Sequence, residues 1–132
     1  MNTINDENFP IVLVTIAPVK EGENSDKYFD DYAALLNREQ KFVMINISNS
    51  PNVKETKSNK EHIKKMNLWM KRHKEKLHTN VLAMIQIETD EVRRAEAIAF
   101  KDIFLKYWGH ELMIVSNYEE ALEIANSRLG RE

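Results

Sequence analysis

Several residue types that would point to particular chemistries are scarce or missing in this chain of 132 residues. Cysteine is absent, which excludes a disulfide framework, a thiol nucleophile and a cysteine-ligated metal site. The three glycines, Gly22, Gly109 and Gly130, form neither a G-x-G-x-x-G nor a Walker A sequence. A classical phosphate-binding loop is therefore not expected, and Glu21 beside Gly22 would also repel a phosphate.

Long hydrophobic runs are missing as well. The longest, from Ile11 to Val19, is interrupted by Thr15 and Pro18 and is too short to cross a bilayer. The first ten residues contain Asp6 and Glu7 but no basic cluster, so no signal or transit peptide is expected. These features predict a cytoplasmic location without a membrane span.

Residue arrangements typical of enzymes are also lacking. The histidines, His62, His73, His78 and His110, do not have the spacing that would let them hold one metal ion. No serine stands in a G-x-S-x-G sequence. Carboxylates such as those of 30–31 are adjacent on a predicted helix, so they point in different directions. We therefore predict a non-enzymatic protein without a metal or other cofactor.

The composition and pattern that are present indicate a globular α/β domain. A hydrophobic content of 42% and a charged content of 30% are typical of a folded protein, and the length suits one domain, 1–132. Continuous β-branched runs indicate strands buried on both faces, and apolar residues three or four apart indicate amphipathic helices. The predicted strands are 10–16, 41–47, 81–87 and 111–115, and the predicted helices are 24–37, 58–77, 89–105 and 116–130.

The helix ends carry capping signals. Thr89 or Asp90 is expected to cap the third helix. Ser116 and Glu119 read as a capping box for the last helix, which Gly130 is expected to end. The whole pattern is βαβαβαβα, and strands joined by helices should be parallel with right-handed crossovers. We predict a four-stranded, mainly parallel sheet with helices packed on it.

Charge is distributed unevenly along the chain. The segment 54–78 holds nine Lys or Arg against three Glu, a local net charge of +6, whereas the remainder has ten basic and eighteen acidic residues, or −8. Such a helix could contact nucleic acid, an anionic lipid surface or an acidic partner, or it could simply be solvated. An acidic remainder makes nucleic acid the unlikely choice. Leu68 and Trp69 extend its apolar surface and either pack under loops or form an exposed contact.

Aromatic residues cluster in the third predicted helix. Phe100, Phe104 and Trp108 follow one another at spacings of four, so they share one face, which is more often core than a ligand cage. Tyr107 and Trp108 lie at the helix end, where they could line a crevice near the sheet edge.

Several local sequences resemble the STAS family, the fold of anti-sigma-factor antagonists, and in particular its short single-domain branch. The similar pieces are PIVLVTIAPV, KFVMINIS, NLWMKRHKEKL, VLAMIQIETDEVRRAEAIAF and IVSNYEEALEIANSRL. The resemblance covers residues from about Pro10 to Leu129. It implies a bacterial protein, a sheet in the order 2-1-3-4 and no enzymatic activity.

The resemblance also implies a regulatory phosphorylation site. In the antagonists, a serine after the second core strand is phosphorylated, which breaks the complex with a partner kinase. The matching loop of this chain holds Ser48, Ser50, Thr56 and Ser58 as possible acceptors. The family's Asp-Ser-Ser-Gly signature is replaced here by the sequence of 48–51, Ser-Asn-Ser-Pro.

Two functional hypotheses follow, from different classes. The leading one is a non-enzymatic STAS-like regulatory or protein-interaction module that contacts a protein through the loop 48–57 and the basic helix 58–78. The contact residues would be Lys57, Lys60, Lys64 and Trp69.

The alternative is a domain that binds a small molecule or lipid in a crevice at the carboxyl ends of the strands, where open parallel sheets bind ligands. Its candidate residues are Arg93, Tyr107 and Trp108. A homodimer, formed through 68–69 or an open sheet edge, is also compatible with the sequence.

Overall fold

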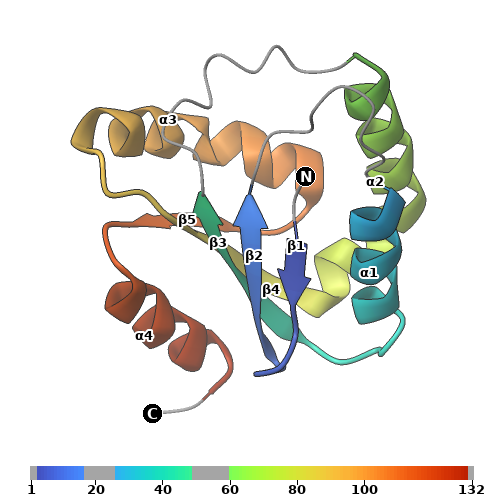
Figure 1. Cartoon of the computed structure of the whole chain (residues 1–132), viewed down its shortest axis with the longest axis horizontal. Coiled ribbons are helices and arrows are strands. Elements are labelled where there is room, and N and C mark those ends of the chain that lie inside the picture. The colour runs from blue at the N-terminus through green and yellow to red at the C-terminus, as the bar shows by residue number, and fades with distance from the viewer. Residues whose placement is uncertain (1–2, 17–25, 49–59, 131–132) are drawn as a thin grey trace.

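The structure is a computed structural model that describes residues 3–16, 26–48 and 60–130 (Figure 1). The strands formed by these residues are β1 (Thr3–Asn5), β2 (Ile11–Ile16), β3 (Phe42–Ser48), β4 (Val81–Ile87) and β5 (Leu112–Val115). The helices are α1 (Asp26–Leu36), α2 (Lys60–Asn80), α3 (Glu91–Trp108) and α4 (Tyr118–Arg128). The predicted α/β class is therefore confirmed, and every predicted strand and helix is found close to its expected bounds.

The strands form one sheet in the order β1-β2-β3-β4-β5. Strands β2 to β5 are parallel, and β1 pairs antiparallel with β2 at one edge. The prediction of four strands in the order 2-1-3-4 is thus wrong in both number and order. No apolar run marks β1, because Thr-Ile-Asn is short and mostly polar.

The error in strand order has a physical cause. An apolar strand such as β2 needs a neighbour on each side, but its side chains do not specify which strands those neighbours are. In the structure β1 takes the place beside β2 that the expected order gave to another strand. Each later strand is then added on the same side, so right-handed crossovers bring α1, α2 and α3 to one face, whereas α4 packs on the opposite face (Figure 1).

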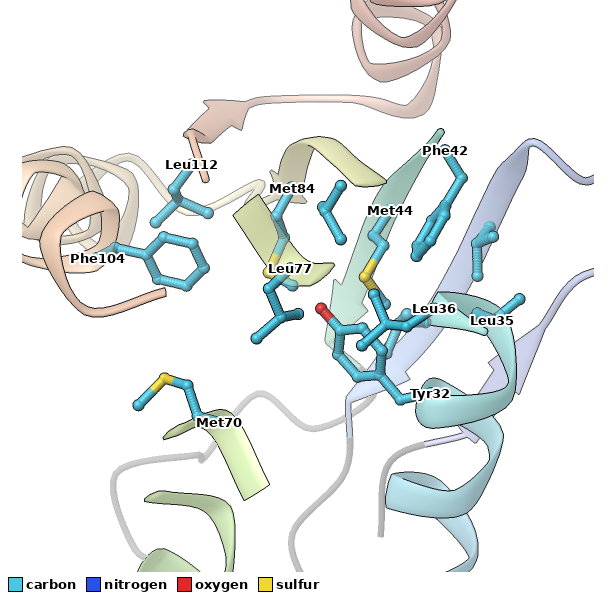
Figure 2. Packing of buried hydrophobic residues seen from close by; sticks show 13 residues of the cluster. Tyr32, Leu35, Leu36, Phe42, Met44, Met70, Leu77, Met84, Phe104 and Leu112 are labelled. Atoms are coloured by element: carbon cyan, nitrogen blue, oxygen red, sulfur yellow. The ribbon is translucent and has the colours of Figure 1, made fainter. Parts of the chain in front are cut away.

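Side chains alternate between two buried clusters on the two faces of the sheet. In β3, Phe42 and Met44 point toward α1, α2 and α3, whereas Val43 and Ile45 point toward α4. Figure 2 shows the larger cluster, in which residues of α1, α2 and α3 converge on the sheet. Its buried members are Val12, Val14, Tyr32, Leu35, Leu36, Phe42, Met44, Met70, Leu77, Val81, Met84, Phe104 and Leu112.

The ends of α3 and α4 are defined by local capping. Asp90 caps α3, since its side chain accepts a hydrogen bond from the backbone N–H of Arg93 at 2.9 Å. The expected Ser116–Glu119 box is shifted by one residue. Asn117 is the cap of α4, and its side-chain oxygen accepts a hydrogen bond from the backbone N–H of Glu120. The carboxylate of Glu120 in turn accepts a hydrogen bond from the backbone N–H of Ser116.

The third helix is less buried than its aromatic pattern suggested. Phe104 is buried and Trp108 is half-buried, but Phe100 is 49% exposed, so the expectation of one aromatic core face holds only in part. The reason is position, because α3 covers β5 at the edge of the sheet and only a narrow face of the helix is enclosed. Among the described helices, none is both long enough and apolar enough to span a bilayer.

Tyr32 is a polar side chain in the centre of the larger cluster. It is fully buried, and Figure 2 shows it projecting from α1 among the apolar residues. Its hydroxyl has no hydrogen-bond partner within the described part of the chain. Burial, with a smaller effect of Tyr28, raises the pKa of this phenol well above its usual value.

Replacing Tyr32 with Phe is expected to leave the free energy of unfolding unchanged, or to raise it by up to about 1 kcal/mol, because a desolvated hydroxyl without a partner is removed. The Leu77→Ala variant is the matched core control and should lose about 2–5 kcal/mol. Urea denaturation of both variants checks these values. A clear loss of stability in Tyr32→Phe would mean that the hydroxyl does have a partner.

Candidate functional site

The rotation of α2 about its axis is set by contacts on three sides. Met70 and Leu77, which are seven positions apart on α2, are both buried against the sheet. On the α1 side, Lys65 pairs with Asp26 at 3.5 Å, and Lys76 donates to the side-chain oxygen of Asn37 at 2.7 Å. The remaining side of the helix is therefore turned to solvent between α1 and α3.

Contacts with α3 hold the other flank of α2. The hydroxyl of Tyr107 lies 3.4 Å from the side-chain oxygen of Asn67. The Nδ1 atom of His78 lies 2.6 Å from the carbonyl oxygen of Gly109, just after α3. At the same end of α2, Asn80 is buried and donates to the last carbonyl of α1, that of Leu36, at 3.1 Å.

The outward face of α2 consists of Lys64, Leu68, Lys71, Arg72 and Glu75. These residues recur at spacings of three and four, and all are exposed. Leu68 is 59% exposed in their midst. Within the described ranges, the three cations of this face, Lys64, Lys71 and Arg72, form no ion pair. The face is therefore a cationic surface with one exposed apolar side chain at its centre.

Trp69 is half-buried against α1, so it is not the exposed contact that the sequence allowed as one alternative. Its ring packs 4.7 Å from that of Tyr32, 5.7 Å from Phe29 and 4.6 Å from His73, measured between ring centroids. Burial, together with nearby Arg72 and Lys76, lowers the pKa of His73. Trp69 thus joins α1 to α2, and Leu68 is the apolar residue on the outward face.

Most of the predicted contact loop falls outside the described part of the chain. This applies to the possible phospho-acceptors Ser50, Thr56 and Ser58, to Lys57, and to the side chains of Ser48 and Lys60. Their assignment stays a prediction. Among the predicted contact residues only Lys64 and Trp69 are described, and of these only Lys64 lies on the outward face.

The structure does not bring together the residues of the predicted ligand crevice. Arg93 lies in the first turn of α3, whereas Tyr107 and Trp108 lie in its last turn. Fifteen residues of helix separate Arg93 from Trp108, or about 22 Å along the axis. Because α3 runs from the end of β4 back to the start of β5, its first turn lies near the carboxyl ends of the parallel strands and its last turn near their amino ends.

A polar pair that the sequence reasoning missed lies near the carboxyl ends of the central strands. Asn46 in β3 and Gln86 in β4 are paired in register, and 44–47 (Met-Ile-Asn-Ile) lies beside 84–87 (Met-Ile-Gln-Ile). Asn46 is buried, and its Oδ1 has no hydrogen-bond partner within the described residues. The sequence contains a signal for this pair, because Asn46 and Gln86 are each the single amide residue in an otherwise apolar strand.

His110 is a second buried polar group without a partner. It precedes β5 and is only 3% exposed, with the rings of Phe104 and Trp108 at 5.3 and 6.1 Å. Neither ring nitrogen has a hydrogen-bond partner in the described segments. Burial lowers the pKa of His110 to about 4, with a smaller opposing effect of the Glu111 backbone and a further lowering by His78. Because no carboxylate or nucleophile among the described residues is hydrogen-bonded to it, we interpret His110 as a core residue and not as a catalytic base.

The described residues contain no group of three or more His, Asp or Glu side chains that could hold a metal ion. In comparisons with known proteins, no protein family, no curated protein and no solved structure matches this chain. The functional argument therefore rests on the geometry of the chain itself.

The stability of the protein is expected to fall as the pH drops from about 6.5 to about 4 because of His110. In that window the unfolded chain binds a proton that the buried imidazole does not, so protons favour unfolding. The cost approaches roughly 3 kcal/mol below pH 4. The His110→Leu variant should lose this part of the pH dependence, which urea denaturation at several pH values would measure. Parallel pH profiles of the two proteins would contradict the assignment.

Proposed function

We propose that this chain is a non-enzymatic protein-interaction module that binds an acidic partner through the outward face of α2. The observation that carries the proposal is the exposure of Leu68 on a face that also carries three cations and one carboxylate, Lys64, Lys71, Arg72 and Glu75. Covering an apolar side chain that is exposed to water lowers the free energy of the system, by about 1.5–3 kcal/mol for the full burial of a leucine. The cations around it have no ion pair among the described residues, so they are available to a partner.

The chemistry of this face favours a particular kind of partner. Lysine and arginine around an apolar centre complement a surface that offers carboxylates around a hydrophobic depression. The charges would speed association and select the partner, whereas burial of Leu68 would hold the complex together. Because the cations are exposed, the affinity should fall as ionic strength rises.

A regulatory role, which the STAS resemblance implies, is part of the proposal. Phosphorylation of Ser48, Ser50, Thr56 or Ser58 would add about two negative charges to the chain segment that leads into α2. Negative charge there would oppose an acidic partner. The strand order that the resemblance implies is not found, so the proposal rests on the α2 face itself.

The proposal predicts that the double variant Lys64→Glu, Lys71→Glu and the single variant Leu68→Ser each lose the partner. The tagged protein would be recovered from cells that produce it, and the co-purified protein identified, purified and titrated against each variant. We expect affinity to fall at least about tenfold in both, as when hydrogen-bonded charges or a central apolar anchor are removed. The melting temperature should be unchanged, since all three side chains are exposed.

The matched control is the double variant Lys41→Glu, Lys106→Glu, which makes the same change in net charge at two exposed lysines outside α2. It should keep the partner. Equal loss in the control would show that net charge alone matters, and equal binding by all variants would exclude the α2 face.

A second function, the binding of a small ligand at the carboxyl ends of the strands, is favoured by one observation. The buried Oδ1 of Asn46 lacks a partner in the described part of the chain and lies in register with Gln86. Amides provide both hydrogen-bond donors and acceptors, so they suit a neutral polar group of a ligand. Arg93 remains near this end of the sheet, whereas Tyr107 and Trp108 do not belong to such a site.

If Asn46 binds a ligand, replacing it with Leu should raise the stability of the protein and abolish ligand binding. The free energy of unfolding should rise by about 1 kcal/mol, because an amide oxygen without a partner is replaced by an apolar group of similar shape. Any small molecule that raises the melting temperature of the wild type should no longer do so in the variant. A variant that is strongly destabilised would show instead that Asn46 is held by the protein itself.

A further inference from the structure

A pocket of about 290 Å³ lies between β1 and α1, on the flank of α1 that faces away from α2. It is distinct from the outward face of α2 and from the carboxyl ends of the strands. Residues of α1 and the turn after it contribute most of its wall. The pocket is lined by Ile4, Asp6, Lys27, Asp31, Ala34, Leu35 and Arg38.

The spacing of these residues explains why they share one side. Lys27, Asp31 and Ala34 follow one another at intervals of four and three, which is the repeat of a single helix face, and Arg38 lies in the turn after α1. Leu35 is buried beside them and provides an apolar floor. The opposite flank of α1 carries the contacts with α2, so a ligand here would leave the α2 face open.

Two ion pairs bring opposite charges to the pocket. Lys27 pairs with Asp31 at 2.9 Å, and Arg38 pairs with Asp6 across from β1. The guanidinium of Arg38 also lies 4.6 Å from the centre of the Phe9 ring, and that ring packs against Phe42. Arg38 is thereby held in place before any ligand arrives, which reduces the entropy lost on binding.

We propose that this pocket binds a small zwitterion whose carboxylate and ammonium groups are separated by a short hydrocarbon chain, as in an ω-amino acid. The carboxylate would bond to Arg38, whose planar fork of donors suits it. The ammonium would bond to Asp31. The chain between them would lie over Ala34 and Leu35.

The balance of charge selects a zwitterion over a simple ion. Two cations and two anions line the pocket, each paired with another, so its net charge is zero. A zwitterion can replace Lys27 as the partner of Asp31 and Asp6 as the partner of Arg38, and the two displaced side chains, which are 75% and 44% exposed, then return to water. The exchange costs little, because exposed ion pairs contribute about 0–1 kcal/mol each.

The distance between the groups selects the length of the ligand. Asp31 lies in α1, and Arg38 lies in the turn after it, seven positions further along the chain. An α-amino acid carries both charged groups on one carbon atom and is too short to reach both residues. A ligand with several methylene groups between the charges can do so.

The test is a titration followed by two-dimensional amide NMR, with ε-aminocaproate as the probe. We expect saturable shifts at Ile4, Asp31, Ala34 and Arg38, at millimolar concentrations because the ion pairs are exposed. Caproate and hexylammonium each lack one of the charges and should bind up to about fivefold more weakly, as the loss of one exposed ion pair allows. Glycine, which is too short, should also bind weakly.

Variants localise the binding. Asp31→Asn and Arg38→Gln should each weaken the binding of ε-aminocaproate by up to about fivefold. The control Lys74→Gln, on α2, should leave it unchanged. Arg38→Gln also removes contacts to Asp6 and Phe9, so Asp31→Asn is the decisive variant if the first one is poorly folded. Absence of saturable shifts, caproate binding as tightly as ε-aminocaproate, or unchanged binding by Asp31→Asn would each overturn the proposal.

Discussion

The parallel pairing of β3 with β4 is the interaction on which the rest of the structure depends. Their side chains are apolar on both faces, so an exposed face would leave a large hydrophobic surface in water. Both faces must be covered, and the connections provide the cover. Three helices pack on one face because the strands are added in sequence, and α4 covers the other.

The same pairing creates the polar position near the end of the strands. Because the two Met-Ile-amide-Ile stretches align in register, Asn46 and Gln86 fall on one face and next to each other. A shift of β4 by one residue would turn Gln86 to the face opposite Asn46. The hydrophobic pattern that holds the sheet together therefore also determines where its buried amides lie.

Much of the fold and part of the candidate site follow from the sequence, and each exception has a physical cause. The α/β class, the core face of α1 and the buried stripe of α2 can be read from local periodicity, since each depends on residues within one element. Strand order cannot, because an apolar strand accepts any apolar neighbour. The grouping of Arg93 with Tyr107 and Trp108 fails for another reason, since α3 has 18 residues and carries Arg93 in its first turn but Tyr107 and Trp108 in its last.

The sequence by itself determined the periodicity of each element and the concentration of positive charge in α2. Only the tertiary structure decided which residues of that helix face water. Contacts with α1 and α3 set its rotation, so that Trp69 packs inside and its neighbour Leu68 lies outside, although both are apolar. The pocket beside β1 has the same origin, because Asp6 and Arg38 meet only when an unforeseen edge strand lies along α1. The local sequence pattern determines the conformation of one helix or strand. Which of its side chains are exposed, and which residues lie near them, depends on every element that packs against it.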